Sequence, residues 1–393
     1  MAPRAASMAG TRFRIGSMSA TARRPFDTMP TTSSGSTKQT VATPRSSASA
    51  LSSSSPSGHD PGVDVARERS EQVTREGEPA VLPIHPSGAG EIRVGTASWT
   101  DPTMTVPGVF YPTGTDTAEE RLGFYAGRFP VVEVDATYYA LPSARTAELW
   151  VDRTPPDFTF DIKAHALMTG QPTETKRLPK VLREELPEDV RTKPRIYGKQ
   201  LPAELLDEFW RLFREGLQPL RESGQLGAVF LQYPRWFFTS SENRAAIVEA
   251  RDRLEGIPVA VEFRNATWFN EKNVDRTLRF LQDNHLPFVM IDGPQGFKSS
   301  VPPLDWVTSE DLAVVRFHGR RAETWEARGV PTVERFRYLY GTDELKEWVP
   351  RIERASKAAR ETHVLMNNCY ANYGATNARE IARLLADLEL GES

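Results

Sequence analysis

The chain lacks several features that define common protein classes. It has one cysteine among 393 residues, Cys369, so no disulfide can form within the chain. No uninterrupted apolar run approaches the ~18 residues that a membrane-spanning helix needs. The net charge is −3, which argues against nucleic acid as a partner because nucleic-acid-binding domains are usually basic. These absences favour a cytoplasmic protein that does not bind membranes.

Residues 1–89 lack the apolar periodicity of a folded domain. They contain runs such as "TTSSGST" and "SSASALSSSSPSG", whose few apolar side chains cannot offset the entropy cost of ordering. We therefore predict a disordered tail over 1–89 and a folded domain over 90–390, and expect deletion of 1–88 to leave the fold intact. The Arg- and Ser-rich, acid-poor composition up to Gly58 also describes an organellar transit peptide, which is the alternative to a cytoplasmic location.

From residue 91 onward, short apolar runs alternate with longer amphipathic segments. Near-continuous apolar strands are expected in a parallel sheet that is covered on both faces. Eight such repeats over about 300 residues predict one TIM barrel, an α/β fold of the (β/α)8 type. The expected strands are 92–99, 131–139, 159–165, 227–234, 258–265, 287–294, 312–319 and 363–370.

Two of the predicted connections are much longer than the others. They read "MTGQPTETKRLPKVLREELPEDVRTKPRIYGKQ", after the third strand, and "GRRAETWEARGVPTVERFRYLYGTD", after the seventh. Both lead from a strand to a helix, so both are expected over the carboxyl face of the barrel, where barrel enzymes bind their substrates.

Charged residues stand at the carboxyl ends of the predicted strands, spaced as side chains that face the barrel interior. Charged groups are rarely buried unless they are paired, so we predict that these residues converge in one polar mouth. The alternating pairs are Glu133 and Asp135, Lys163 and His165, Glu262 and Arg264, and Arg316 and His318. At the same level on other strands are Gln232, Asp292, Asn367 and Asn368.

The charges of this mouth favour a small anionic or sugar-like ligand. Arginine's planar fork matches a carboxylate or a phosphate. A glutamate base in a solvated mouth, with His318 as acid or relay, completes a general acid–base site of hydrolase or isomerase/lyase type. The expected catalytic residues are Glu133, Lys163, Glu262 and His318. The expected substrate-binding residues are Trp99, Tyr138, Gln232, Arg264, Asp292, Arg316, Asn367 and Asn368.

Other interpretations of the same residues stay open. The sequence requires no cofactor, but a divalent metal is possible and would indicate a metal-dependent hydrolase of phosphodiesters or other esters. Against a metal stand four nearby cations, Lys163, Arg264, Arg316 and Arg320. The charges can also be ion pairs that plug the barrel, or the site of a non-catalytic ligand-binding protein. In the metal-dependent interpretation, the ligands would come from Glu133, Asp135, Glu262, Asp292 and His318.

Three further chemistries have less support. A glycosidase needs two carboxylates about 5.5 Å or more apart, and the fourth and seventh strands end in other residue types. Lys163 as a Schiff-base amine is disfavoured by nearby carboxylates, and a lone cysteine such as Cys369 is usually an apolar filler. The aromatic residues at strand ends fit packing and ligand stacking equally well; they are Trp99, Tyr138, Tyr139, Trp236 and Trp268.

Several segments occur in an order that resembles a known family. They include "VGTASWTDP", "EERLGFYAGRFPVVEVDATYYALPS", "LGAVFLQYP", "AVEFRNATWF" and "VVRFHGR". Together they are similar to the YecE-like family, domain of unknown function 72, over nearly all of 91–390. The resemblance implies a TIM barrel and no established activity, and His165 and Cys369 do not match its motifs. It leaves the oligomeric state open. The matching motif positions are Glu133, Lys163, Glu262, Arg264, Arg316, His318 and the Asn367–Asn368 pair.

Overall fold

A computed structural model of the protein describes residues 79–391. Most of the expected tail, residues 1–78, therefore lies outside the described residues. The core of the described chain is a sheet of eight parallel strands in the order β7-β6-β3-β2-β1-β10-β9-β8. The strands are β1 (Glu91–Ala97), β2 (Val131–Val134), β3 (Thr159–Lys163), β6 (Leu226–Gln232), β7 (Val259–Glu262), β8 (Val289–Asp292), β9 (Leu312–Phe317) and β10 (Glu361–Met366).

The two edge strands of this order, β7 and β8, meet and close the sheet into a barrel. Val261 and Phe288 form a parallel bridge, and the Val261 amide donates to the carbonyl of Pro287 at 2.8 Å. A closed sheet has no free edge, so every strand is paired on both sides. All eight predicted strands are present, and the TIM-barrel prediction is confirmed.

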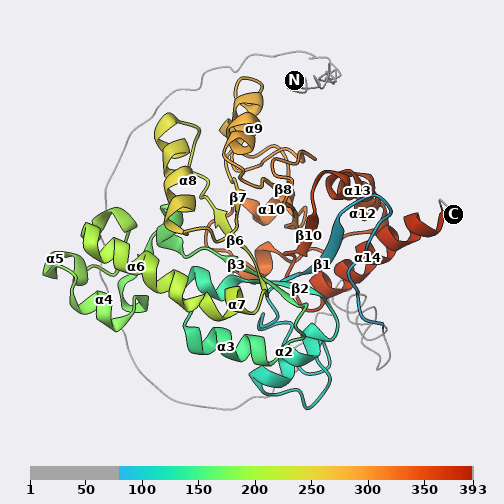
Figure 1. The fold of residues 1–393 in the computed structure, drawn as a ribbon, viewed down its shortest axis with the longest axis horizontal. Helices are drawn as coiled ribbons and strands as arrows, with labels where there is room; N and C mark the ends of the chain where they lie inside the picture. The colour runs from blue at the N-terminus through green and yellow to red at the C-terminus, as the bar shows by residue number, and fades with distance from the viewer. Residues whose placement is uncertain (1–78, 392–393) are drawn as a thin grey trace, which may run out of the picture. The chain divides into compact units, whose positions relative to one another are not determined.

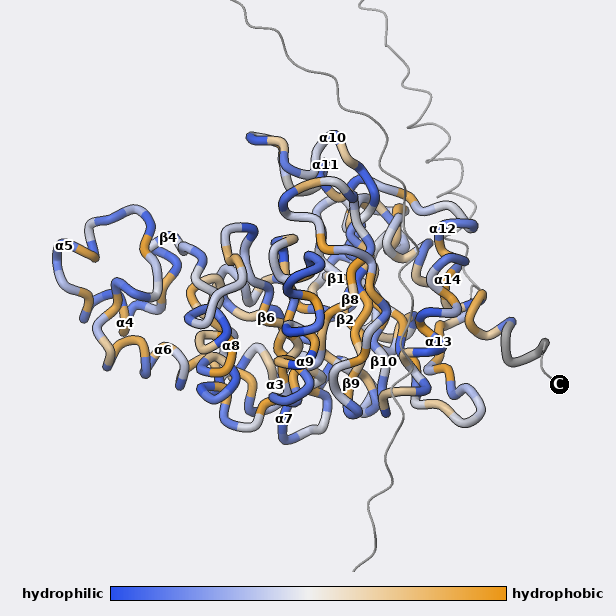
Figure 2. Tube along the Cα trace, turned by 90° about the horizontal axis from the view of Figure 1, so that it is seen from above, coloured by the Kyte–Doolittle hydropathy of each residue, from blue (hydrophilic) through white to orange (hydrophobic). Residues whose placement is uncertain are grey.

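Helices follow most of the strands and cover the outside of the barrel (Figure 1). Figure 2 shows hydrophobic residues concentrated along the strands and hydrophilic ones on surrounding helices such as α9. Thr117 and Glu120 form a capping box at the start of α2. The principal helices are α2 (Ala118–Ala126), α3 (Ala144–Asp152), α6 (Ala203–Gly216), α7 (Gln218–Glu222), α8 (Ser241–Arg253), α9 (Val274–Asp283), α12 (Thr342–Lys346), α13 (Val349–Ala358) and α14 (Tyr373–Gly391).

The two long connections contain short elements of their own. The connection after β3 holds helices α4 (Lys180–Glu184) and α5 (Glu188–Arg191) and a two-stranded antiparallel sheet. The two strands of that small sheet are β4 (Thr173–Glu174) and β5 (Arg195–Ile196). The connection after β9 holds α10 (Ala322–Trp325) and α11 (Thr332–Arg335).

The connection between β8 and β9 departs from the expected repeat, because it contains no helix. Pro294, Pro302 and Pro303 lie in this stretch, and proline removes a backbone donor and breaks a helix. Thr308 holds the connection against β8 instead: its hydroxyl accepts from the Phe288 amide at 2.8 Å and donates to the Leu286 carbonyl at 2.6 Å. The expectation of eight complete βα repeats is wrong at this one place.

The folded domain begins before residue 90. Ile84 forms two backbone hydrogen bonds with Ile92 of β1, at 2.8 and 2.9 Å, and its side chain is buried in the core. The Val81 amide donates to the Arg128 carbonyl at 2.9 Å. The prediction that disorder extends to residue 89 is therefore wrong for 81–84, because local composition does not reveal a strand-like pairing with β1.

Deletion of 1–88 should consequently destabilise the protein relative to deletion of 1–78. The longer deletion removes the buried Ile84 side chain, worth about 1.5–3 kcal/mol, and its backbone hydrogen bonds, worth about 0.5–1.5 kcal/mol each. We expect the free energy of unfolding to fall by about 2.5–6 kcal/mol between the two truncated chains. Urea denaturation of both chains measures this, and equal midpoints would show that the Ile84 pairing contributes nothing.

Candidate functional site

The barrel interior near the carboxyl ends of the strands is filled by linked ion pairs, here called the buried chain. Its members are Glu133, Arg316, Glu262 and Arg264. Arg316 of β9 lies at its centre, and its Nη2 is 2.6 Å from Glu133 Oε2 on β2. Its Nη1 donates to Glu262 Oε2 on β7. All three side chains are fully buried. The predicted convergence of these strands therefore occurs, and each buried charge has a partner of opposite sign.

Arg264 extends the series of buried ion pairs towards solvent. Its Nε is 2.5 Å from Glu262 Oε1, and its guanidinium lies over the Trp325 ring at 5.2 Å. The Arg264 side chain keeps 12% of its surface exposed, whereas Glu262 keeps none. Arg264 is thus the member of the buried chain that reaches the mouth, held in place by a carboxylate and an aromatic ring.

His318 lies beside Arg264 and is fully enclosed. The Arg264 Nη2 atom is 3.0 and 3.3 Å from the two imidazole nitrogens, and the Asn367 amide nitrogen is 2.7 Å from Nδ1. Burial, reinforced by the charge of Arg264, lowers the pKa of His318 to about 3. The imidazole is therefore neutral at physiological pH, which fits a hydrogen-bonding relay and does not fit an imidazolium acid.

The two glutamates of the buried chain, Glu133 and Glu262, have pKa values shifted in opposite directions. Burial raises the pKa of Glu133 to about 7, against the opposing effect of Arg316. Burial also acts to raise the pKa of Glu262, but Arg264 and Arg316 outweigh it and hold that pKa well below its usual range. Glu262 is thus a buried, ionised partner of two arginines, and the expectation that it faces a solvated mouth is wrong.

Lys163 and Asp135 form a second, partly exposed pair at the mouth. The Lys163 ammonium is 2.7 Å from Asp135 Oδ1 and 5.6 Å from the centre of the Tyr138 ring. Burial acts to lower the pKa of Lys163, but Asp135 and Glu133 outweigh it and raise that pKa. The Tyr138 hydroxyl donates to Gln171 Oε1 at 2.9 Å, which links this pair to the residues above the barrel.

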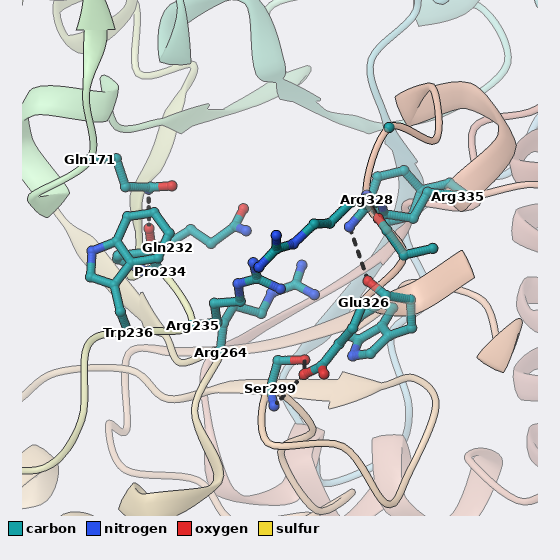
Figure 3. A pocket seen from close by; sticks show the side chains of 14 residues that line it. Gln171, Gln232, Pro234, Arg235, Trp236, Arg264, Ser299, Glu326, Arg328 and Arg335 are labelled. Carbon is teal, nitrogen blue, oxygen red and sulfur yellow. Dashed lines mark hydrogen bonds between the residues drawn. The ribbon is translucent and has the colours of Figure 1, made fainter. Parts of the chain in front are cut away.

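A pocket of about 430 Å³ lies over the buried chain (Figure 3). Of the predicted site residues, Gln232 and Arg264 line it. The remainder of its wall comes from Gln171 in the connection after β3, from the loops after β6 and β8, and from the connection after β9. From these loops come Pro234, Arg235, Trp236, Ser299, Trp325, Glu326, Ala327, Arg328, Gly329, Arg335 and Phe336.

Sequence reasoning located these loops but missed most of their residues. The long connections were predicted to lie over the carboxyl face, and the pocket wall agrees for both. Within the connection after β9, "AETWEARGVP" carries a tryptophan and charged residues that lie away from the strand ends, so the alternation of side chains along a strand does not predict their direction. Trp236 was singled out as an aromatic residue at a strand end, whereas Arg235, three residues after the end of β6, was missed although this position was an available signal.

Asp292 and Arg320 lie outside the barrel, contrary to the prediction. In the register of β8 and β9, Ile291 is opposite Arg316, so Asp292 is opposite Phe317 and points outward. Asp292 accepts from the indole nitrogen of Trp348 at 2.7 Å and pairs with Arg320 at 2.7 Å. The assignment of Asp292 to the mouth overlooked the alternation of side chains along β8.

Four other residues considered in the sequence also face away from the pocket. The Trp99 ring packs edge-on against Trp150 of α3, with the ring centres 5.9 Å apart, so Trp99 belongs to the layer between strands and helices. Asn368 donates to Asn377 of α14 and to a loop carbonyl. His165 lies past the end of β3 and packs on Phe209 of α6. The fourth is Cys369, whose thiol donates to the Ala97 carbonyl and whose pKa is raised by burial.

The possible metal site finds no set of ligands in the part of the chain that the structure describes. No group of three or more His, Cys, Asp or Glu side chains in residues 79–391 is placed to hold a metal ion. The carboxylates proposed as ligands are instead engaged by arginine or lysine, as for Glu133, Glu262 and Asp135.

The helices of residues 79–391 include none with the length and apolar character of a membrane span.

A second buried pair, Asp161 and His363, lies deeper in the barrel and was not predicted as a pair. His363 Nδ1 is 2.8 Å from Asp161 Oδ2, and its Nε2 is 3.3 Å from Glu361 Oε2. Burial acts to lower the pKa of His363, but the two carboxylates outweigh it and raise that pKa to about 9. Asp161 also accepts from the Ala228 amide at 3.0 Å, so this pair links neighbouring strands, and neither of its residues lines the pocket.

His363 should make the protein less stable as pH rises from about 6.5 to about 9. Its pKa is near 6.5 when unfolded and about 9 when folded, so the folded state binds the proton more tightly. The contribution, about 3 kcal/mol by linkage, is complete below pH 6.5 and is lost by pH 9. Urea denaturation at several pH values measures the loss. Asp161→Asn should abolish most of this slope, whereas His85→Gln, a change at an exposed histidine, should leave it unchanged.

The sequence matches the model of the family "Protein of unknown function DUF72" over residues 93–391. The chain belongs to the DUF72 family. This DUF72 chain is 31% identical over 301 residues to the UPF0759 protein YunF of Bacillus subtilis, a match that covers 76% of the chain and 95% of that protein. The resemblance to domain of unknown function 72 seen in the sequence is thereby confirmed.

Solved structures of the DUF72 family resemble the barrel described above. A DUF72 family protein of Enterococcus faecalis superposes with a TM-score of 0.58 at 26% identity, covering 75% of this chain and 97% of that one. A DUF72 family protein of Thermotoga maritima gives a TM-score of 0.57 at 30% identity, covering 75% and 99%. These comparisons show family and fold, and the chemistry has to be argued from the site itself.

Proposed function

We propose that this DUF72 protein is an enzyme that acts on a small anionic or sugar-like substrate in the pocket over the barrel mouth. Arg264 binds the anionic group of that substrate. A TIM barrel carries its chemistry at this face, and a volume of about 430 Å³ lies in the range of small-molecule sites. A cytoplasmic location is part of the same proposal, because the single cysteine requires no oxidising compartment.

The observation that carries the proposal is the placement of Arg264. Its backbone position at the end of β7, its contact with Glu262 and its packing on Trp325 all fix the guanidinium before any ligand arrives. Its remaining exposed surface lines the pocket. A preorganised guanidinium loses little side-chain entropy on binding, which favours tight and specific recognition of a phosphate or carboxylate.

Two titratable groups lie below the pocket. Lys163 is held in its charged form by Asp135 and is one side chain away from Gln171 in the pocket wall. Glu133 has a pKa raised to about 7 by burial, so it gains or loses a proton near neutral pH. In this proposal Glu262 and His318 are positioning residues that hold Arg264, and they do not exchange protons with the substrate.

The test begins with anion binding to the full chain. Phosphate, sulfate and citrate should raise the free energy of unfolding, by ~2.7 kcal/mol at about a hundred times the dissociation constant. Chloride at matched ionic strength should not do so. Equal stabilisation by chloride would show general screening and would remove the basis of the proposal.

A non-catalytic binding protein is the second candidate, favoured by one observation. Glu133, Glu262 and His318 are fully enclosed, so the groups with acid–base chemistry have no direct surface in the pocket. Incubation with a metabolite mixture, followed by mass spectrometry, separates the two candidates. Consumption of an anion with formation of a product supports the enzyme, and retention of an unchanged anion supports the binding protein.

A further inference from the structure

Trp236 is the tryptophan of the loop after β6 that faces the pocket. Among the aromatic residues singled out in the sequence, Trp99 and Trp268 are buried in the core, whereas Trp236 is 52% exposed. Its neighbour Phe237 points inward and stacks between Tyr233 and Trp268, with ring centres 4.0 and 5.7 Å away. The loop therefore has an inward aromatic anchor, and the exposed indole of Trp236 is left over as part of the pocket wall.

The charges around this indole have the same sign. Arg235, Arg264 and Arg328 extend towards the middle of the pocket in Figure 3. Arg264 is paired with Glu262, but within residues 79–391 no carboxylate pairs with Arg235 or Arg328. Three guanidinium groups gathered with one carboxylate partner indicate that an anion is the missing neighbour.

The size of that anion's charge follows from the pocket wall. Four arginines and one carboxylate line the pocket, the last arginine being Arg335 and the carboxylate Glu326. Glu262, beneath the pocket, neutralises Arg264. Three positive charges and one negative charge then remain, a net charge of +2, which a dianion balances.

The volume of the pocket exceeds what an inorganic dianion fills. A volume of about 430 Å³ lies in the range of sites that hold small organic molecules. A single tetrahedral oxyanion occupies only a small part of this space. The remaining space lies beside the Trp236 indole and the apolar side chains of Pro234 and Phe336, which also line the pocket.

We infer that the pocket binds a phosphate monoester of a ring compound, with the phosphate among the arginines and a flat apolar face of the ring stacked on Trp236. A phosphate monoester carries close to two negative charges at pH 7 and matches the arginine fork. An indole stacks on an aromatic ring, and it also packs against the apolar face of a sugar ring. The inference rests on the anion site of the proposed function and adds the ring and the residue that selects it.

The experiment compares three probes by isothermal titration calorimetry on the full chain: inorganic phosphate, phenyl phosphate and glucose 6-phosphate. At least one of the ring phosphates should bind about tenfold or more tightly than inorganic phosphate. The ring that shows the gain identifies the source, an aromatic ring for phenyl phosphate and a pyranose for glucose 6-phosphate. If neither ring phosphate binds more tightly than inorganic phosphate, the inference is overturned.

Trp236 variants locate the gain. Trp236→Ala should remove the advantage of the ring phosphate and leave inorganic phosphate affinity within about twofold, whereas Trp236→Phe should keep most of the advantage. Trp306→Ala is the matched control, because Trp306 is similarly exposed, at 49%, and does not line the pocket. An advantage that survives in Trp236→Ala, or is lost equally in Trp306→Ala, contradicts the assignment of the ring to Trp236.

Failure of this inference is distinguishable from failure of the proposed function. If inorganic phosphate binds but a ring adds nothing, the anion site stands and the ring-stacking role of Trp236 is wrong. If none of the three probes binds, both the anion site and the inference built on it are wrong.

Discussion

Glu262→Gln is expected to lower the free energy of unfolding by about 3–5 kcal/mol. Glu262 is fully buried between Arg316 and Arg264, so the uncharged amide leaves two guanidinium groups with too little negative charge nearby. Removing one partner of a buried ion pair has an effect of this size because the remaining charge stays desolvated. Urea or guanidinium denaturation of the purified variant and the parent measures the difference.

Glu148→Gln is the matched control for this change. Glu148 pairs with Arg145 on the surface of α3, where its side chain is 50% exposed, and exposed pairs contribute about 0–1 kcal/mol. A loss in Glu262→Gln no larger than that in Glu148→Gln would contradict the structural role. Such a result would instead indicate that Glu262 is kept for function, at a site where the residue does not stabilise the free protein.

Arg264→Gln should weaken phosphate binding by about a hundredfold or more, equivalent to about 2.7 kcal/mol. Arg264 is the part of the buried chain that lines the pocket, and its replacement removes the preorganised donor. The variant should lose less stability than Glu262→Gln, since Glu262 keeps its contact with Arg316. Calorimetric titration with phosphate, together with denaturation of the free protein, gives both quantities.

Arg145→Gln serves as the control for Arg264, because Arg145 is an exposed arginine of α3 outside the pocket. It changes the net charge of the protein by the same amount and should leave phosphate affinity within about twofold. Phosphate affinity that is unchanged in Arg264→Gln would remove Arg264 from the anion site and overturn the proposed function.

The buried chain explains why Arg264 is available to a ligand. Glu133, Arg316, Glu262 and Arg264 alternate in sign, so the buried charges balance one another inside the barrel. Their desolvation is unfavourable, and the geometry they impose holds one guanidinium rigidly at the floor of the pocket. A guanidinium held rigidly in this way favours tight binding of one kind of ligand over adaptation of the site to several kinds.

The order and number of the strands were determined by the sequence alone. Apolar runs such as "GAVFLQYP" and "PVAVEFRN" have the composition of strands buried on both faces. Alternation along β2, β7 and β9 was sufficient to predict that Glu133, Glu262 and Arg316 face one interior. A period of two is a local property, so the sequence contains it without reference to the rest of the fold.

The roles of these residues were decided only by tertiary structure. Whether Glu262 is a solvated base or a buried partner depends on which side chains arrive from strands far away in the sequence, here Arg316 at 54 positions' distance. The same holds for Asp292, whose partners Trp348 and Arg320 come from outside the barrel. The pocket wall combines loops after β3, β6, β8 and β9, because closing the barrel brings the carboxyl ends of distant strands to one face, and no local pattern records that proximity.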